Sequence, residues 1–273
     1  MKLAICVSGQ TRRHNDYNNE WFGAITELFG DYDYDLFGHT WLDQPIPITK
    51  SKFKKFTVDD QSMMERWAEK DPLQRVYHDI SWIKNKDYHA KLVDGSWYEH
   101  AIGATKRAYG QFWSALLCYE LVSSDYDLIV RYRWDISLQE NIQQVKRAIQ
   151  NFAKAQSYTE ALQGQIDKNF EPMINTDVLV STPSRSDYIE DMFFVSNNKI
   201  LKCKSKPIAY WMDEMMRIQY PEKPVAHKGW ASLLKAMELN VVAGMPNAHY
   251  DLDFDRKMAE NASGNQYYPK DEF

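Results

Sequence analysis

Small and charged residues follow a short apolar run at the start of this sequence, and their types suit the binding of phosphate. Ser8-Gly9-Gln10-Thr11-Arg12-Arg13 comes directly after the apolar run Lys2–Val7. A loop of small residues exposes backbone N–H groups, and arginine side chains hold phosphate oxygens. The alternative interpretation is a surface turn with solvated arginines.

A second set of charged residues ends the apolar run that begins at Asp127. Arg131, Arg133 and Asp135 alternate along it, so in a strand they share one face, opposite Tyr132 and Trp134. A carboxylate at the end of a strand suits a hard divalent cation that bridges phosphates. The alternative is an internal Arg–Asp salt bridge.

A third candidate is the acidic pair Glu190-Asp191, which stands directly before Met192-Phe193-Phe194. A carboxylate that is partly desolvated by apolar neighbours can act as a general base. The alternative is an ordinary pair of surface acids at a helix or strand end.

The elements that must position these residues follow a strand–helix–strand order. Lys2–Val7 predicts a strand, residues 16–30 a helix and Tyr34–Trp41 a second strand, which favours a parallel sheet with helices on its faces. We predict one α/β domain over residues 1–258 with a polar tail at 259–273. The other expected elements are helices at 59–70, 104–122, 140–155, 207–219 and 228–239, strands at 73–83, 127–135, 176–180, 191–195 and 240–243, and a loop at 156–172.

Composition excludes several classes of protein. The hydrophobic fraction of 44% is enough for a sizeable core, and the net charge of −5 argues against a nucleic-acid partner. No apolar run reaches the ~18–20 residues of a transmembrane helix, and the N-terminal apolar run is too short for a signal peptide. Cys6, Cys118 and Cys203 are odd in number and far apart, which indicates free thiols and a cytoplasmic location rather than a metal cluster.

Four segments resemble, in order, one enzyme family. KLAICVSGQTR, YDLFGHTW, YDLIVRYRWD and EDMFFVS together resemble nucleotide-sugar glycosyltransferases of the GT-A fold, and most closely the small viral and bacterial transferases of surface-polysaccharide biosynthesis. The resemblance covers residues 1–200, with weaker matching to residue 255. It implies a GT-A-like, Rossmann-like α/β domain with a central, mostly parallel sheet flanked by helices.

The resemblance also implies roles for single residues. Asp135 would hold Mn²⁺ or Mg²⁺ against the donor diphosphate, with His249, or as second choice His227, completing the metal shell; a structural role is the alternative for either histidine. Asp191, beside Glu190, would be the base of an inverting enzyme. The residues expected to line the nucleotide are Ser8, Gly9, Gln10, Thr11, Arg12, His39 and Arg131.

One departure from the family pattern concerns the metal motif, usually Asp-x-Asp, because Arg133 stands in place of its first acid. Two possibilities stay open: a metal-assisted site with one carboxylate, or a metal-independent site in which Arg131 or Arg133 neutralises the departing diphosphate.

We therefore predict a glycosyltransferase that uses a nucleotide-sugar donor and a glycan or lipid-linked acceptor. Alternatives are a non-catalytic carbohydrate-binding protein of the same fold and a nucleotidyltransferase or phosphotransferase. Aromatic side chains suit the faces of sugar rings. Those expected near the acceptor are Trp41, Trp97, Tyr98, Trp211 and Trp230.

Overall fold

The structure, a computed structural model, describes residues 1–11, 14–16, 18–69, 109–138, 141–157, 171–181, 189, 193–219, 226–246 and 249–251. Residues 109–120 within these ranges are helical. The other elements are β1 (Lys2–Ser8), η1 (His14–Asp16), α1 (Asn18–Phe29), β2 (Asp33–Trp41), η2 (Ile48–Lys52), β3 (Lys55–Asp59), α2 (Ser62–Glu69), β4 (Leu128–Arg133), β5 (Ile136–Leu138), α6 (Ile142–Gln156), α7 (Glu171–Ile174), β6 (Val178–Ser181), β7 (Phe193–Asn197), η5 (Asn198–Ser205), α8 (Ile208–Gln219), α9 (Ala226–Ala236), β8 (Val241–Met245) and β9 (His249–Asp251).

A seven-stranded sheet in the order β3-β2-β1-β4-β7-β6-β8 forms the centre of the molecule. β7 runs antiparallel to its neighbours β4 and β6, and the remaining pairs are parallel. β5 and β9 form a separate two-stranded sheet. Parallel neighbours require crossover connections, and α1 provides the one between β1 and β2.

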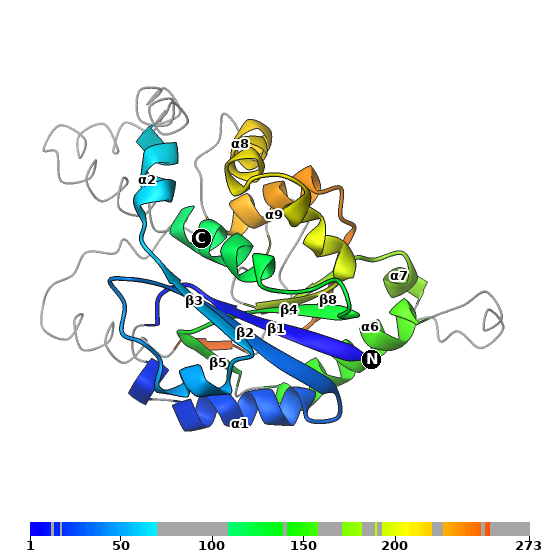
Figure 1. Ribbon diagram of the computed structural model, residues 1–273. Coiled ribbons are helices and arrows are strands. Elements are labelled where there is room, and N and C mark those ends of the chain that lie inside the picture. The colour runs from blue at the N-terminus through cyan, green and yellow to red at the C-terminus, as the bar shows by residue number, and fades with distance from the viewer. Residues whose placement is uncertain are drawn as a thin grey trace, which may run out of the picture.

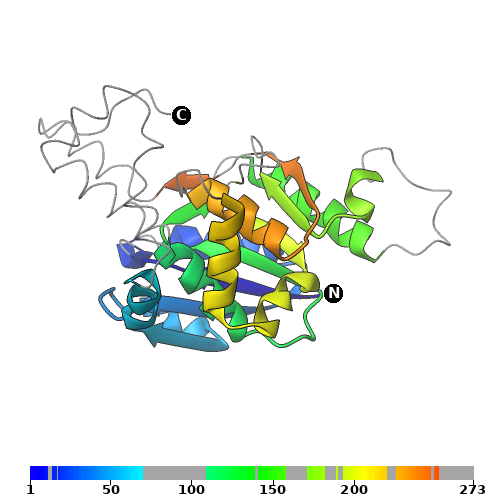
Figure 2. The ribbon, with the colours of Figure 1, turned by 90° about the horizontal axis from the view of Figure 1, so that it is seen from above.

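Helices cover both faces of this sheet (Figure 1). α1 and α6 lie on one face, whereas the helix of residues 109–120, α8 and α9 lie on the other. In the view from above, α8 and α9 cross in front of the strands (Figure 2). The protein is thus a three-layer α/β domain, and the predicted fold class, with its mostly parallel sheet and flanking helices, is confirmed.

β1 separates two hydrophobic cores. Leu3, Ile5 and Val7 pack toward α1 and α6, whereas Ala4 and Cys6 pack toward the 109–120 helix and α9. Successive side chains of a strand point to opposite faces, so a strand covered on both sides must be apolar at every position. This requirement explains the uninterrupted apolar run at the start of the sequence.

Most predicted elements are confirmed within a few residues, including the central strands and the helices on both faces. The helix expected at 59–70 begins at Ser62, because residues 55–59 form the edge strand β3 instead. β3 is partly exposed along its length, so its sequence lacks the continuous apolar run that predicts a buried strand. The three-residue strands β5 and β9 also escaped prediction, since so short a pairing leaves no period in the sequence.

Some predictions fall outside the described residues. These are the strand at 73–83, most of the loop at 156–172, whose last residues 171–172 begin α7, and the tail at 259–273. The domain boundary at residue 258 therefore stays a prediction. None of the described helices combines the length and apolarity that crossing a membrane requires.

Candidate functional site

The carboxyl ends of three adjacent parallel strands bring the predicted site residues together. In the register of β2, β1 and β4, Ser8 is paired with His39 on one side and with Arg133 on the other. The chain leaves β1 toward β2 and later returns to β4 on its opposite side, so the strand order reverses beside β1. In open α/β sheets, ligands bind outside the carboxyl ends of strands at such a switch point.

Gly9 forms the turn that ends β1. Its φ is +113°, a conformation that side chains rarely adopt, and the position of its missing Cβ faces open space. Its N–H donates to Ser114 Oγ at 2.8 Å, and its carbonyl accepts from Thr40 Oγ1 at 3.0 Å. Gly9 is itself buried, and these two hydrogen bonds fix the peptide groups of the turn.

The residues after Gly9 differ in their surroundings. Thr11 is buried, and its hydroxyl donates to the Pro45 carbonyl at 2.7 Å. Gln10 is half-buried. Arg12 lies outside the described residues, so its predicted contact with phosphate stays a prediction.

Arg131 is a buried cation under the end of β1. It donates from Nη1 to Ser8 Oγ at 2.7 Å, and its guanidinium lies 4.7 Å from the centre of the Trp230 ring. A buried charge needs such hydrogen-bonding and aromatic partners because it has lost its water. Only 1% of the Arg131 surface is exposed, so its hydrogen bond to Ser8 is a buried contact at the end of β1.

Arg133 and Asp135 form a bidentate pair at the same edge. Arg133 Nε donates to Asp135 Oδ1 at 2.8 Å, and Nη2 donates to Oδ2 at 2.5 Å. The Asp135 side chain is 4% exposed and that of Arg133 is 11% exposed. The internal salt bridge that was one interpretation of this sequence motif is therefore present.

The donor set around Asp135 does not fit a divalent cation. Both of its carboxylate oxygens accept hydrogen bonds from Arg133. Hard cations take several oxygen ligands, yet the described residues hold no group of three His, Cys, Asp or Glu side chains that could bind a metal. A guanidinium at this carboxylate occupies the place where the sequence had suggested Mn²⁺ or Mg²⁺.

His249 belongs to β9, whose backbone pairs with β5. In that register Leu138 is paired with His249 and Ile136 with Asp251, which places β9 beside the segment that follows Asp135. His227 belongs to α9, on the other side of the sheet from α1. The side chains of both histidines lie outside the described residues, as do Glu190 and Asp191, so their roles stay predictions.

His39 is fully buried at the end of β2. Its Nδ1 lies 2.6 Å from Ser114 Oγ, and its Nε2 lies 3.2 Å from Asp59 Oδ2, although that second contact falls short of a well-aligned hydrogen bond. Burial lowers the pKa of His39 to about 3, so the ring is neutral at physiological pH. Sequence reasoning missed Ser114, although it is a polar residue inside the apolar stripe of the 104–122 helix.

The comparisons with known proteins give distant likenesses. No family model matches the chain, and no curated protein matches it. The chain is similar to the galactosyltransferase LgtC in complex with donor and acceptor sugar analogues, with 10% identity and a TM-score of 0.39 over 89% of this chain and 73% of that chain. An active-site mutant of LgtC gives 10% identity and a TM-score of 0.41 over 89% and 72% of the two chains.

A third similar structure is mouse xyloside xylosyltransferase 1 in its apo form, with 8% identity and a TM-score of 0.38 over 89% of this chain and 83% of that chain. LgtC and the xylosyltransferase are both glycosyltransferases. At such low identities and TM-scores they assign neither a substrate nor a residue role to this chain.

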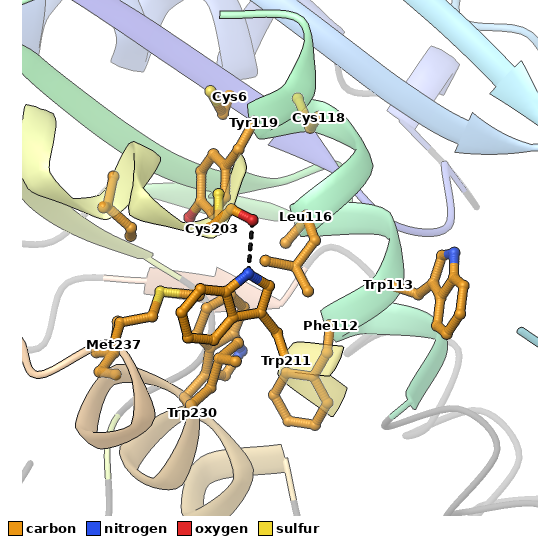
Figure 3. Close-up of a cluster of buried hydrophobic side chains, with 14 of the residues drawn as sticks. Cys6, Phe112, Trp113, Leu116, Cys118, Tyr119, Cys203, Trp211, Trp230 and Met237 are labelled. Carbon is orange, nitrogen blue, oxygen red and sulfur yellow. Dashed lines mark hydrogen bonds between the residues drawn. The ribbon is translucent and has the colours of Figure 1, made fainter. Parts of the chain in front are cut away.

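Three of the aromatic residues expected near the acceptor are instead part of the core. Trp41, Trp211 and Trp230 are buried, so the prediction is wrong for them. Figure 3 shows Trp211 and Trp230 among Phe112, Leu116 and Met237, with Trp211 Nε1 donating to the Cys203 carbonyl at 2.6 Å. In the sequence, the polar neighbours of these tryptophans and their indole N–H groups suggested an exposed position. Trp97 and Tyr98 lie outside the described residues.

The three cysteines are free and buried, as predicted. Burial raises the pKa of the Cys203 thiol to about 12 and that of Cys6 well above its usual range. A thiol that stays protonated is a poor nucleophile and metal ligand. These residues therefore serve the core between the sheet and α9.

Proposed function

We propose that this chain is a glycosyltransferase that moves a sugar from a nucleotide-sugar donor to a hydroxyl acceptor. The observation that carries this proposal is the meeting of the Gly9 turn with the Arg133–Asp135 pair at the carboxyl ends of β1 and β4. The turn, which Ser114 and Thr40 hold in place, lies at the switch point, and the pair holds a guanidinium at the same edge in a fixed orientation. Both features suit a diphosphate.

The reaction needs stabilisation of a leaving diphosphate. As the acceptor oxygen bonds to the anomeric carbon, the bond from that carbon to the diphosphate oxygen breaks, and its electron pair leaves with the phosphate. A cation aimed at this developing charge lowers the barrier most when it is already oriented. Asp135 orients Arg133 through two hydrogen bonds, so this chain has its own cation for that purpose. No step of the proposal passes through a metal ion.

The acceptor hydroxyl must lose its proton. In an inverting reaction we assign that proton to Asp191, with Glu190 beside it; in a retaining reaction Asp191 would bind the acceptor instead. We further propose a glycan or lipid-linked acceptor, as in polysaccharide biosynthesis. The three free, buried thiols support a reducing compartment, and we therefore place the reaction in the cytoplasm.

The experiment is incubation of the purified protein with separate UDP-sugars and GDP-sugars, with and without Mn²⁺, while released nucleotide is analysed by chromatography. We expect release of nucleoside diphosphate from one donor and loss of that release in Arg133→Ala. The control for the loss of an arginine is Arg217→Ala, because Arg217 pairs with Glu214 on the exposed face of α8, and turnover is compared at a temperature at which thermal unfolding curves show both variants folded. That variant should keep wild-type turnover.

Other results would contradict the proposal. Release of pyrophosphate would indicate a nucleotidyltransferase. Absence of binding to any nucleoside diphosphate at millimolar concentration would exclude a donor site of the proposed kind. Glycan binding that is unaffected by Arg133→Ala, without turnover, would indicate a non-catalytic carbohydrate-binding protein.

A further inference from the structure

A chain of polar contacts runs from the surface to the Gly9 turn through the interior. Asp59 Oδ2 lies 3.2 Å from His39 Nε2, His39 Nδ1 lies 2.6 Å from Ser114 Oγ, and Ser114 Oγ accepts from the Gly9 N–H at 2.8 Å. These four residues come from β3, β2, the 109–120 helix and the end of β1. His39 and Ser114 are fully buried, while the Asp59 side chain is 47% exposed.

The hydrogen atoms of these contacts can be arranged as a relay that runs from Asp59 to Gly9. The Ser114 hydroxyl has a single hydrogen, and its oxygen already accepts from Gly9. If that hydrogen is donated to Nδ1 of a neutral His39, the ring proton must be on Nε2, facing the Asp59 carboxylate. The opposite tautomer would set a bare Nε2 lone pair against a carboxylate oxygen. In this arrangement Asp59 acts on the Nε2–H of His39 through its charge, without a well-aligned hydrogen bond, and Ser114 connects His39 to Gly9.

Among these four residues, Gly9 belongs to the turn that we take as part of the donor site. Its N–H is held by Ser114, and its carbonyl is held by Thr40. These two contacts determine the direction in which residues 10 and 11 leave β1. Because His39 and Ser114 are buried, they do not contact a ligand directly. Any effect that they have on ligand binding passes through this turn.

We propose that Ser114 and His39 are positioning residues of the donor site. They hold the Gly9 turn in the conformation that receives the diphosphate, with Asp59 orienting His39 from the surface. This inference rests on the proposed function, since it takes the turn to be where the diphosphate binds.

The test is calorimetric titration of UDP and GDP into the full chain, followed by donor and acceptor KM values with the nucleotide sugar that is turned over. Ser114→Ala should weaken binding of the nucleoside diphosphate about tenfold, the effect of losing one buried hydrogen bond. The donor KM should rise by about the same factor, because the same site binds both. The acceptor KM should not change.

Ser196→Ala is the matched control. Ser196 is also fully buried in the sheet, and its hydroxyl donates to the Ile129 carbonyl at 3.1 Å, away from the turn. It should lower the melting temperature about as much as Ser114→Ala and leave nucleotide binding unchanged.

Two further variants test the relay itself. His39→Asn keeps an acceptor for the Ser114 hydroxyl, but its shorter side chain cannot reach Asp59. It should weaken binding of the nucleoside diphosphate about threefold, which is less than the roughly tenfold loss expected for Ser114→Ala. Asp59→Ala removes the surface end of the relay at a half-exposed position that tolerates substitution. It should weaken binding about threefold with little change in melting temperature.

The outcomes separate this inference from the proposed function. If the wild-type protein binds neither UDP nor GDP, the proposed function fails. If it binds one of them and both Ser114→Ala and Asp59→Ala bind it equally well, the positioning role is overturned while the proposed function stands. Equal weakening by Ser196→Ala would also overturn it, because the effect would then be a general loss of packing. If Ser114→Ala does not fold, wild-type binding by Asp59→Ala alone overturns the inference.

Discussion

Arg133 and Asp135 form a charge pair within one short stretch of the chain. They are two residues apart at the end of β4, and their side chains join through two hydrogen bonds. With a second acid in place of Arg133, two carboxylates would face each other and require a cation. With arginine there, the guanidinium supplies a positive charge that faces the Asp135 carboxylate.

We predict strong coupling between these two residues. Arg133→Ala should lower the free energy of unfolding by ~3–5 kcal/mol, because it leaves a buried carboxylate without its partner. The double variant Arg133→Ala/Asp135→Ala should lose less than the sum of the single losses, with an interaction energy of ~1–3 kcal/mol. Urea denaturation of the four proteins measures this cycle, and simple additivity would contradict the prediction.

A second buried carboxylate, Asp177, joins three strands at the opposite edge of the sheet. Its Oδ2 accepts from the Asn240 backbone N–H at 2.9 Å, and its Oδ1 accepts from Asn197 Nδ2 at 3.1 Å and lies 2.7 Å from Lys199 Nζ. Burial alone would raise the pKa of Asp177, but these hydrogen bonds outweigh it and lower the pKa below its ordinary value.

This shift predicts an acid-sensitive contribution to stability. Because the folded state binds the proton less tightly than the unfolded chain, the stabilisation is present above the unfolded pKa of ~4 and is lost as pH falls through the folded pKa. The free energy of unfolding should therefore decline more steeply below pH ~4 in the wild type than in Asp177→Asn, which does not titrate. Urea denaturation at several pH values measures this difference, and parallel pH curves would contradict it.

At the scale of elements, close packing decides where the 109–120 helix lies. An added Cβ at Gly229 in α9 would stand 2.3 Å from Phe112 Cζ, so the Phe112 ring occupies the space that a side chain at position 229 would need. The same helix carries Ser114, which contacts Gly9 and His39.

Gly229→Ala should accordingly destabilise the protein. Overpacking against the Phe112 ring costs ~1–3 kcal/mol and offsets the better helix propensity of alanine. The matched control is Gly23→Ala in α1, where nothing lies within 4 Å of an added Cβ. That variant should gain ~0.5–1 kcal/mol. Thermal or urea denaturation compares them, and equal effects in the two helices would contradict the packing argument.

At the scale of the whole molecule, we expect stability to be highest along the centre of the sheet. β1 is hydrogen-bonded to strands on both sides and covered by a core on both faces, whereas β3 is a partly exposed edge strand of five residues. Amides that open only with the whole fold exchange slowest. The candidate site begins where this most protected strand ends, so its backbone has a rigid support.

Hydrogen exchange followed by mass spectrometry checks this distribution. Peptides covering β1 and β4 should exchange slowest, at the rate of global unfolding. Peptides covering β3, and the two-stranded sheet of β5 and β9, should exchange by local opening and therefore faster. Uniform protection across these strands would contradict the expectation. A nucleoside diphosphate, if bound as proposed, should add protection to residues 9–11.

Local periodicity in the amino-acid sequence was enough to predict the α/β class, most of the central strands and the place of the charged residues at strand ends. An apolar run covered on two faces has a characteristic pattern, and it is visible without any knowledge of distant contacts. The same local signal explains the misses. It cannot tell a half-exposed edge strand such as β3 from a loop, and it cannot tell whether Trp230 faces sugar or core.

For the motif of Arg133 and Asp135, the salt bridge came to light in the folded structure instead. In the folded protein, Arg133 donates hydrogen bonds to Asp135, and the Arg131 guanidinium packs on the Trp230 ring. The Gly9 N–H donates to Ser114, which is 105 residues away in the sequence. Such contacts depend on strand register and on how closely helices pack against the sheet, to within about an ångström. The periodicity of apolar residues along the sequence carries no information about those distances. The contacts between the site residues therefore became known only from the tertiary structure.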